Sequence, residues 1–546
     1  MKYFKNKYIY YLLIPFVLAL LGIGYGLPMH LIGDEEALIG GTLKMLELRQ
    51  PFPVLAPETF KFLYYPPMLP YLYILASLPV IIFKFAVSGF DVLALKDYFV
   101  LNLDGIWISA RLTTAIFSLG VLVVTYKITK LIFSKQTAYL ATALLSVSFF
   151  HVLLSHWARH WIFTVFLVYL TVLLALLFTR GKIKKHWLIG LIAGIALGTT
   201  YLTLAGLGLA ILILWFYRHQ IVRPIKKIVI NIALAFVVGF SLIFINLPDL
   251  LRFRHGDDAV AEPFKKSLGG FLGHLGQVVT TLFNQEFIIL VLVMLSLLLY
   301  KRYLKIKLFI LFSIFAYFAA LYLFFHFENR YVYFIVPVLA MLSADFLRYL
   351  IWQIKNRKVA YAIIILIFIW PVLSVINYTR LILVNDTREL AVQYINQEIE
   401  DQEFLLASPY VNLHRSLDSL SVAQDYGRIN ARERYVYSSY KKLTSNFDQE
   451  YNYQNLHFWT ENSQSQDVLE EYINKYQPSY FVLEYWDEDD LAGYYQNLRQ
   501  NVNLVKIFRQ SDLDQNYDIN GNFWAFNSIL FKLDRLGPRV EIYKIK

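Results

Sequence analysis

The sequence predicts a polytopic α-helical membrane protein of about 11 transmembrane helices, with further juxtamembrane helices and a soluble α/β domain at its C-terminus. The first observation is composition: 57% of the 546 residues are hydrophobic, and apolar runs of roughly 20 residues recur along the chain. The second is charge. Residues 1–385 hold 35 Lys and Arg against 15 Asp and Glu, whereas residues 386–546 hold 16 against 25. We therefore expect a membrane domain over 1–385 and an acidic soluble domain over 386–546.

Five short basic loops set the predicted orientation. By the positive-inside rule these loops and the N-terminus are cytoplasmic, which places the C-terminal domain on the extracytoplasmic side of a multi-pass plasma (inner) membrane protein. We expect no nucleic-acid partner, because the basic residues are scattered among loops. The loops are residues 127–135, 180–185, 218–227, 301–307 and 348–358. The predicted spans are 8–26, 105–126, 137–155, 161–179, a tight pair in 187–217, 228–247, 284–300, 308–326, 331–350 and 359–379.

Residues 27–104 are external in this topology, yet one segment within them, 66–87, is apolar enough to cross a membrane. We favour a juxtamembrane or re-entrant helix there, because the five basic loops agree with that topology. The alternative is a true span with one misassigned neighbour. The acids support the orientation, since only Asp345 among those of residues 1–385 falls away from the predicted outer segments and outer span ends.

The sequence pattern changes after about residue 385. Residues 386–389 are typical of a helix start, with an amphipathic run to Ile399. Many Tyr and Asn residues here could contact sugar, although ordinary packing explains them more simply. The absence of cysteine excludes disulfides and thiolate metal sites. Short strand-forming runs follow at 404–407, 479–483, 504–508 and 540–543, with a helical stretch at 467–476, which predicts an α/β domain.

Gly33-Asp34-Glu35-Glu36 places three carboxylates directly after the first apolar segment, before an amphipathic helix predicted for residues 37–49. Acids are scarce in the membrane domain, with none between residues 105 and 248, so these three call for a reason. One interpretation is structural: Asp34 caps the helix and the glutamates complement its dipole. The other is catalytic: a partly desolvated carboxylate can take a proton from an acceptor hydroxyl as that oxygen attacks an electrophilic carbon.

Cationic residues in three other places could bind phosphate. Arg159 and His160 lie in a predicted external turn, Arg330 lies in another beside Glu328, and Arg111 lies about two turns into a span. Arginine binds phosphate through charge-assisted hydrogen bonds. For Arg330 the structural alternative is an anchor of its turn at the membrane interface.

The sequence suggests one possible cofactor, a divalent metal. His156 and His160, spaced i and i+4, could bind one if their turn is helical, although that spacing alone is a weak signal. Tyr65 lies in the same outer region, before Pro66 and Pro67; its structural interpretation is a stiff entry to the 66–87 helix. Glu58 and Lys61 lie just before it and could line the same cleft as the acids.

In their order and topology these motifs resemble the GT-C class of polytopic glycosyltransferases. The similarity is to the bacterial branch related to protein O-mannosyltransferases and lipid A aminoarabinose transferases, and it covers about residues 8–400. That class has juxtamembrane helices after its first external loop, as we favour for 66–87. The motifs are Gly33-Asp34-Glu35, Tyr65-Pro66-Pro67, Ala110-Arg111-Leu112, Gly194-Ile195-Ala196-Leu197-Gly198, Asn329-Arg330-Tyr331 with Pro337, and Asp386-Thr387-Arg388.

The resemblance implies an inverting hexosyl- or pentosyltransferase. The donor would be a polyprenyl-phosphate-linked sugar and the acceptor a hydroxyl of a lipid, glycan or protein at the outer face of the bilayer. Asp34 would be the catalytic base and Glu35 its neighbour in the motif. Many relatives carry an acid after the arginine of the second external turn, whereas here His160 follows Arg159. The residues expected to bind substrate are Arg330, Arg111, Arg159, His160, Tyr65, Lys61 and Glu58.

Two other functions compete with this prediction. A lipid-linked-sugar flippase or transporter would carry ionisable residues at mid-bilayer and internal repeats, and the sequence suggests neither. A non-catalytic membrane assembly or receptor protein that presents the C-terminal domain stays open, because His160 replaces the acid found in many relatives.

Overall fold

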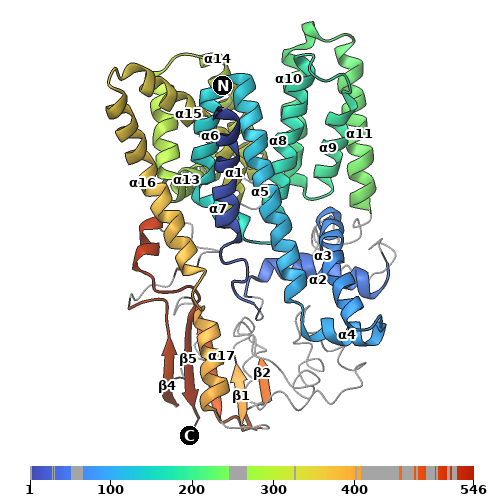
Figure 1. Ribbon diagram of the computed structural model, residues 1–546, viewed down its shortest axis with the longest axis vertical. Coiled ribbons are helices and arrows are strands. Elements are labelled where there is room, and N and C mark those ends of the chain that lie inside the picture. The colour runs from blue at the N-terminus through green and yellow to red at the C-terminus, as the bar shows by residue number, and fades with distance from the viewer. Residues whose placement is uncertain are drawn as a thin grey trace. The chain divides into compact units, whose positions relative to one another are not determined.

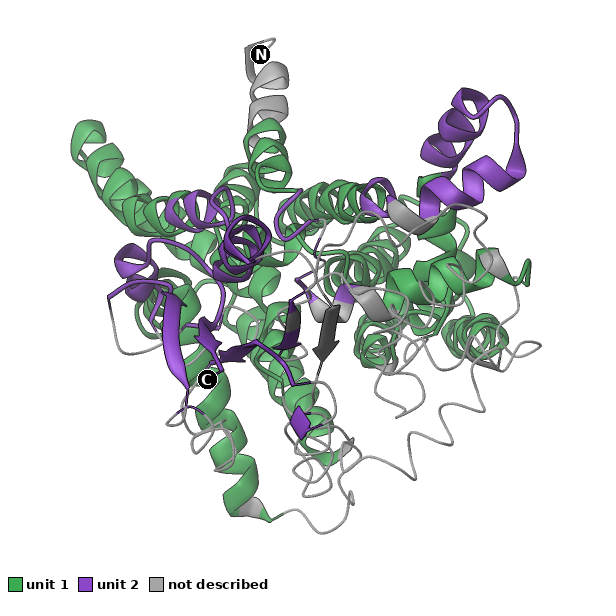
Figure 2. Cartoon of the chain, turned by 90° about the horizontal axis from the view of Figure 1, so that it is seen from below, with its two compact units in different colours: residues 1–23, 37–77, 107–376 green, residues 24–36, 78–106, 377–546 purple. Residues whose placement is uncertain are grey.

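The computed structural model describes residues 3–27, 29, 31–50, 66–244, 267–324, 328–399, 403–407, 454–457, 473–474, 477–486, 499, 502–512, 517–518 and 526–545. Two compact units divide the chain: residues 1–23, 37–77 and 107–376, and residues 24–36, 78–106 and 377–546 (Figure 2). Glu58, Lys61 and Tyr65 lie outside the described residues, as does most of the predicted 467–476 helix.

The described part of the first unit is helical (Figure 1). Its elements are α1 (Tyr3–Leu20), most of α2 (Gly33–Glu47), half of α3 (Met68–Val87), most of α5 (Asp104–Ile132), α6 (Lys135–Ser146), α7 (Phe149–Ser155), α8 (His160–Thr179), α9 (Trp187–Leu197), η3 (Tyr201–Thr203), α10 (Leu204–Phe216), η4 (Arg218–Gln220), α11 (Pro224–Phe244), α13 (Leu268–Leu299), α14 (Leu304–Phe324), η5 (Asn329–Phe334), α15 (Val336–Gln353) and most of α16 (Arg357–Leu381).

Within the described residues, seven helices are long and apolar enough to cross a membrane: α3, α5, α8, α11, α13, α14 and α16. The α6–α7 pair, bent by 60°, makes an eighth if it is one span. A polytopic helical membrane protein is therefore confirmed. Fewer helices than the predicted number pass this test, because α9 and α10 are short and polar residues interrupt α1 and α15. Since α3 passes it, the juxtamembrane placement of 66–87 stays a prediction.

Glycines allow α9 to pack closely on α11, which lies beside it in Figure 1. A Cβ added at Gly190 would lie 2.5 Å from the carbonyl oxygen of Asn231, and one at Gly198 would lie 2.3 Å from Leu242 Cδ1. The Gly190 amide also donates a hydrogen bond to Asn231 Oδ1 at 2.9 Å. Small residues spaced by four thus bring the two backbones together. The turn between α9 and α10 lies at 198–203, where the sequence predicts it.

Two predicted spans differ in the structure. The helix predicted for 284–300 begins at Leu268, so α13 includes part of the connection between the predicted spans 228–247 and 284–300. The span predicted for 137–155 is broken, since α6 ends at Ser146 and α7 begins at Phe149. Ser148 is the N-cap of α7, and a new helix start with its own cap explains the break.

The second unit contains a mixed five-stranded sheet in the order β2-β1-β3-β5-β4. β1 pairs in parallel with β2 and β3, and β5 pairs antiparallel with β3 and β4. Four strands confirm predicted ones, whereas β2 was not predicted. The elements of this unit are α4 (Val92–Leu101), α17 (Thr387–Glu398), β1 (Phe404–Ala407), β2 (Gln454–His457), β3 (Tyr480–Tyr485), β4 (Asn503–Phe508), η8 (Asn527–Lys532) and β5 (Arg539–Lys544).

The helix α17 begins with a capping box and covers the core of this unit. Asp386 Oδ1 accepts from the Arg388 amide at 3.0 Å, and the Asp386 amide donates to Glu389 Oε2 at 3.1 Å. The helix predicted after residue 385 is thereby confirmed. The core residues of α17 and the strands are Ala391, Val392, Ile395, Ile399, Leu405, Ala407, Val482, Val540 and Ile542, and Met29 and Leu31 join them.

Candidate active site

Two turns that are far apart in the sequence bring cationic side chains together in the first unit. One joins α7 to α8 and carries Arg159, directly before His160, the first residue of α8. The other is the short helix η5, which carries Arg330, whose guanidinium lies 5.7 Å from the ring centre of Trp161. His160 follows Arg159 in the chain, and its ring lies against that of Trp161, the same ring that Arg330 approaches. Three of the predicted substrate-binding residues therefore form one cluster.

Arg330 is the more accessible cation. It is paired with Glu328, with Nη2 2.7 Å from Oε2 and Nε donating to the same oxygen at 3.1 Å. The side chains of Arg330 and Glu328 are 16% and 35% exposed. The rings of Trp161 and Tyr331 are 5.3 Å apart beside it. A guanidinium with solvent access next to aromatic rings can accept an anion and a sugar face together.

Arg159 and His160 are more deeply buried than Arg330, at 5% and 3% exposure. Arg159 is the N-cap residue of α8, and its guanidinium lies 5.4 Å from the ring of Trp157. The ring of His160 contacts that of Trp161 at 4.1 Å. The start of α8 adds a partial positive charge of its own. This end of the helix is suited to an anion.

The paired-histidine metal site does not form. α7 ends at Ser155 and α8 begins at His160, so the intervening turn is not the continuous helix that the i, i+4 spacing requires. His156 Nδ1 lies 2.7 Å from the Val152 carbonyl oxygen, and Nε2 lies 2.9 Å from that of Leu18. Both ring nitrogens thus face carbonyl oxygens. In the part of the chain that the structure describes, no three His, Asp or Glu side chains are grouped to hold a metal ion.

Arg111 lies on α5 and is directed at the end of α1. Its Nη1 donates to the Ile23 carbonyl oxygen at 2.7 Å, and its side chain is almost completely buried. His156 approaches the Leu21 carbonyl oxygen at 3.0 Å in the same region. The last carbonyls of a helix need donors and favour cations. These contacts give Arg111 a structural role that the sequence did not suggest.

Glu286 is an acid that the sequence interpretation missed. It lies at a kink inside α13, with φ −130° and ψ 39°, and is 5% exposed. Its Oε1 accepts from Ser148 Oγ at 2.5 Å and from the Phe150 amide at 2.9 Å. The carboxylate therefore binds the N-terminus of α7, the helix that leads to Arg159. The available signal was an acid within a predicted span.

A second contact joins the two cationic turns. His151 Nδ1 lies 2.7 Å from the hydroxyl of Tyr333, so α7 is bonded to η5. In addition, Tyr169 on α8 donates to the Phe334 carbonyl oxygen at 2.9 Å. α7 and α8 flank the turn that carries Arg159, and η5 carries Arg330. The positions of Arg159 and Arg330 therefore depend on these buried hydrogen bonds between the helices that flank or carry them.

The predicted base lies in the second unit. α2 begins at Gly33, so Asp34 and Glu35 lie in its first turn. Asp34 is therefore not the N-cap residue that the structural interpretation expected. Glu35 is fully buried, and the Asp34 side chain lies outside the described part of the structure. Acids in a first turn do complement the helix dipole, as the structural interpretation requires.

Comparison with known proteins bears on the membrane segment. Residues 101–243 match the family model of dolichyl-phosphate-mannose-protein mannosyltransferases. The resemblance to GT-C glycosyltransferases is confirmed over these residues. They carry Arg111, Arg159 and His160, whereas Asp34 and Arg330 lie outside the match. No curated protein sequence matches the chain.

Solved structures of two other proteins are also similar to this chain. Apo ArnT from Cupriavidus metallidurans is 11% identical, with a TM-score of 0.48 and 98% of each chain covered. The same protein bound to undecaprenyl phosphate is 10% identical, with a TM-score of 0.46 and the same coverage. The Archaeoglobus fulgidus oligosaccharyltransferase tethered to an acceptor peptide is 12% identical, with a TM-score of 0.44, and the match covers 89% of this chain and 70% of that one.

Proposed function

We propose that this protein is a membrane glycosyltransferase that moves a sugar from a polyprenyl-phosphate-linked donor to an acceptor hydroxyl. Residues 1–385 would form the transferase domain, and residues 386–546 an extracytoplasmic α/β domain. The observation that carries the proposal is the convergence of His160 and Arg330 on Trp161, with Arg159 directly before His160 at the start of α8. The family match over residues 101–243 supports it.

The departing polyprenyl phosphate would bind between Arg330 and the start of α8. Leaving-group charge grows as the bond to the sugar breaks, and fixed cations at low dielectric stabilise it. Arg330 would contact the phosphate directly, because its side chain and that of its partner Glu328 both keep solvent access. Arg159 would supply further positive charge next to it, and the buried ring of His160 would offer a hydrogen-bond donor. We assign Arg111 to holding the end of α1 instead, because of its bond to Ile23.

Asp34 would act as the base that deprotonates the acceptor hydroxyl, with transfer at the extracytoplasmic face and inversion at the anomeric carbon. Glu35 would support it from the same helical turn. Glu58, Lys61 and Tyr65 would add substrate contacts.

The test is a transfer assay in membranes with a radiolabelled polyprenyl-phosphate sugar. Arg330→Gln removes the charge, and we expect KM for the donor to rise at least tenfold. Arg218→Gln is the matched control, since Arg218 also lies over a tryptophan ring, at 4.7 Å from Trp215, but at an exposed position. Equal kinetics for the two variants would refute the phosphate site.

Transport is the second candidate, because ionisable residues do lie within the helices. Glu286 sits at the kink of α13, and Lys307 pairs with Asp345 between α14 and α15. Each has fixed local partners, which favours structural roles for them. The two functions give different products: a flippase exposes the lipid-linked sugar on the other leaflet without a new glycosidic bond, whereas a transferase releases polyprenyl phosphate.

A further inference from the structure

The segment between α1 and α2 is built into the C-terminal domain. Met29 and Leu31 are 6% and 7% exposed and share the core of α17 and β5. Gly26 has a φ of +70°, and the Leu31 amide donates to its carbonyl oxygen at 3.3 Å. The left-handed conformation at this glycine closes the turn. The turn leads directly to Gly33, where α2 and its acids begin.

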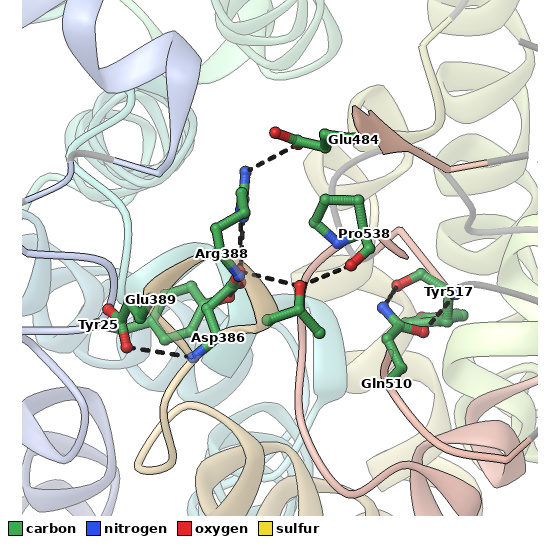
Figure 3. Close-up of polar contacts among 9 residues, drawn as sticks. Tyr25, Asp386, Arg388, Glu389, Glu484, Gln510, Tyr517 and Pro538 are labelled. Atoms are coloured by element: carbon green, nitrogen blue, oxygen red, sulfur yellow. Dashed lines mark hydrogen bonds and ion pairs between the residues drawn. The ribbon is translucent and has the colours of Figure 1, made fainter. Parts of the chain in front are cut away.

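A buried polar cluster fastens this segment (Figure 3). The hydroxyl of Tyr25 donates to Asp386 Oδ2 at 2.5 Å, across 361 residues of sequence. Arg388 binds the same carboxylate at two points, with Nε 2.9 Å from Oδ1 and Nη2 3.1 Å from Oδ2. Glu484 of β3 lies 3.8 Å from Arg388 Nη1. We call Tyr25, Asp386, Arg388 and Glu484 the tether cluster.

The chain that enters β5 fixes the carboxylate of this cluster from the other side. Gly537 has a φ of +106°, and a Cβ there would lie 2.2 Å from Asp386 Oδ1. Thr387 donates from its amide to the Leu536 carbonyl oxygen at 3.0 Å and from Oγ1 to that of Pro538 at 2.6 Å. Asp386 therefore cannot shift without moving both α17 and the approach to β5. A hydroxyl that donates to such a fixed carboxylate is held strongly and in one direction.

We propose that the tether cluster positions the acidic start of α2 for sugar transfer, with Tyr25 and Asp386 as positioning residues that act through the turn after Gly26. This inference rests on the proposed role of Asp34 as the base. Catalytic groups must stay within about 0.5 Å of productive geometry. The C-terminal domain supplies this constraint, because its core and its buried carboxylate both hold the backbone that leads to Asp34.

The experiment compares two variants that each remove one hydroxyl and keep the ring. Tyr25→Phe breaks the bond to Asp386. Tyr485→Phe is the matched control, because its hydroxyl donates to another buried carboxylate of the same sheet, Glu541, at 3.0 Å. We expect Tyr25→Phe to raise hydrogen exchange in residues 24–36 and to lower kcat about tenfold, with KM for the donor unchanged. Tyr485→Phe leaves exchange in 24–36 and kcat at wild-type values.

Asp386→Asn completes a double-mutant cycle with Tyr25→Phe. The two losses in kcat should be non-additive, since both substitutions act on the same hydrogen bond: Tyr25→Phe removes its donor, and Asp386→Asn takes the charge from its acceptor. Additive losses, unchanged exchange in Tyr25→Phe, or an equal loss of kcat in Tyr485→Phe would each overturn the tether. Exchange is measured on the full chain without substrate. A wild-type protein with no transferase activity would therefore refute the proposed function, while the exchange data still decide whether Tyr25 holds the segment.

Discussion

Lys307 Nζ lies 3.5 Å from Asp345 Oδ2, and both side chains are completely buried. The ammonium also donates to Ser296 Oγ at 2.9 Å, to the Ser296 carbonyl oxygen at 3.0 Å and to the Tyr300 carbonyl oxygen at 2.8 Å. The pair fastens the C-terminal end of α13 to α14 and α15. Asp345 is the one acid of residues 1–385 that falls away from the predicted outer segments. Its pairing with Lys307, a lysine of a predicted basic loop, accounts for this position.

The two partners should respond unequally to mutation. Lys307→Met leaves a buried carboxylate without its cation, and we expect it to destabilise the protein by about 3–5 kcal/mol. Asp345→Asn leaves the ammonium bonded to three oxygens and should cost on the order of 1 kcal/mol. Thermal unfolding in detergent measures both. Equal losses would contradict this account, and Lys307→Met combined with Asp345→Leu should recover most of the stability.

The protein should tolerate loss of the Glu286 charge better than loss of the side-chain oxygen that accepts its two hydrogen bonds. In Glu286→Gln one oxygen can still accept from Ser148 and from the Phe150 amide, so stability and transfer should stay near wild type. Glu286→Leu leaves those buried donors without an acceptor and should cost about 1–3 kcal/mol. It should also raise KM for the donor, because α7 leads to Arg159.

The comparison of Glu286→Gln with Glu286→Leu needs both unfolding and transfer measurements. Ser148→Ala is a useful companion, since it removes one of the two donors and should give an intermediate loss of stability. A Gln variant as damaged as the Leu variant would show instead that the negative charge is required, as a proton-coupled transporter would need.

Glu484 should make the C-terminal domain less stable as the pH rises. Burial, with Asp386 adding to it and Arg388 opposing it, raises the pKa of Glu484 from its usual value to about 8. Between about pH 4.5 and pH 8 the unfolded chain has lost this proton and the folded chain retains it. The unfolded state thus binds fewer protons, and stability falls through this window and levels off above it.

Glu484→Gln replaces the titrating carboxyl with an amide and should flatten the pH dependence of the free energy of unfolding. At pH 8 it should be more stable than the wild type, by a difference on the order of a few kcal/mol. Denaturant unfolding from pH 5 to pH 9 measures it. Asp512→Asn is the control, because that carboxyl is 98% exposed. An unchanged slope in Glu484→Gln would show that Glu484 is ionised in the folded protein.

Asp34→Asn tests the base. If Asp34 takes the acceptor proton, kcat should fall roughly 10²–10⁴-fold, with little change in KM for the donor. Glu36→Gln, two residues along the same helix, is the control for a general effect of negative charge at the start of α2. Wild-type turnover in Asp34→Asn would exclude the assignment.

Local sequence signals were sufficient for much of the fold. The apolar runs marked the membrane helices, and the Asp386-Thr387-Arg388-Glu389 motif marked the start of α17, because a capping box is complete within four residues. Four strands were also found from their own residues. β2 was missed, because Gln454–His457 has only one strongly apolar residue and becomes a strand by pairing with β1.

The candidate site was predicted only in part. The sequence identified Arg159, His160 and Arg330 by their place beside helix starts, but it could not bring them together, since that contact joins turns about 170 residues apart. It suggested phosphate for Arg111, which binds the end of α1. It did not single out Glu286. This acid lies at a kink inside α13, and such a kink leaves no periodic pattern in the sequence.

By itself, then, the sequence determined the membrane class of this protein, its soluble α/β domain and the residue types of its candidate site, since hydropathy, charge and capping act over short stretches of chain. The tertiary structure decided which side chains meet. Tyr25 reaches Asp386, Lys307 reaches Asp345 and Glu286 reaches the start of α7 only after folding. Such contacts depend on how packed elements juxtapose distant residues, and neighbouring residues do not encode them.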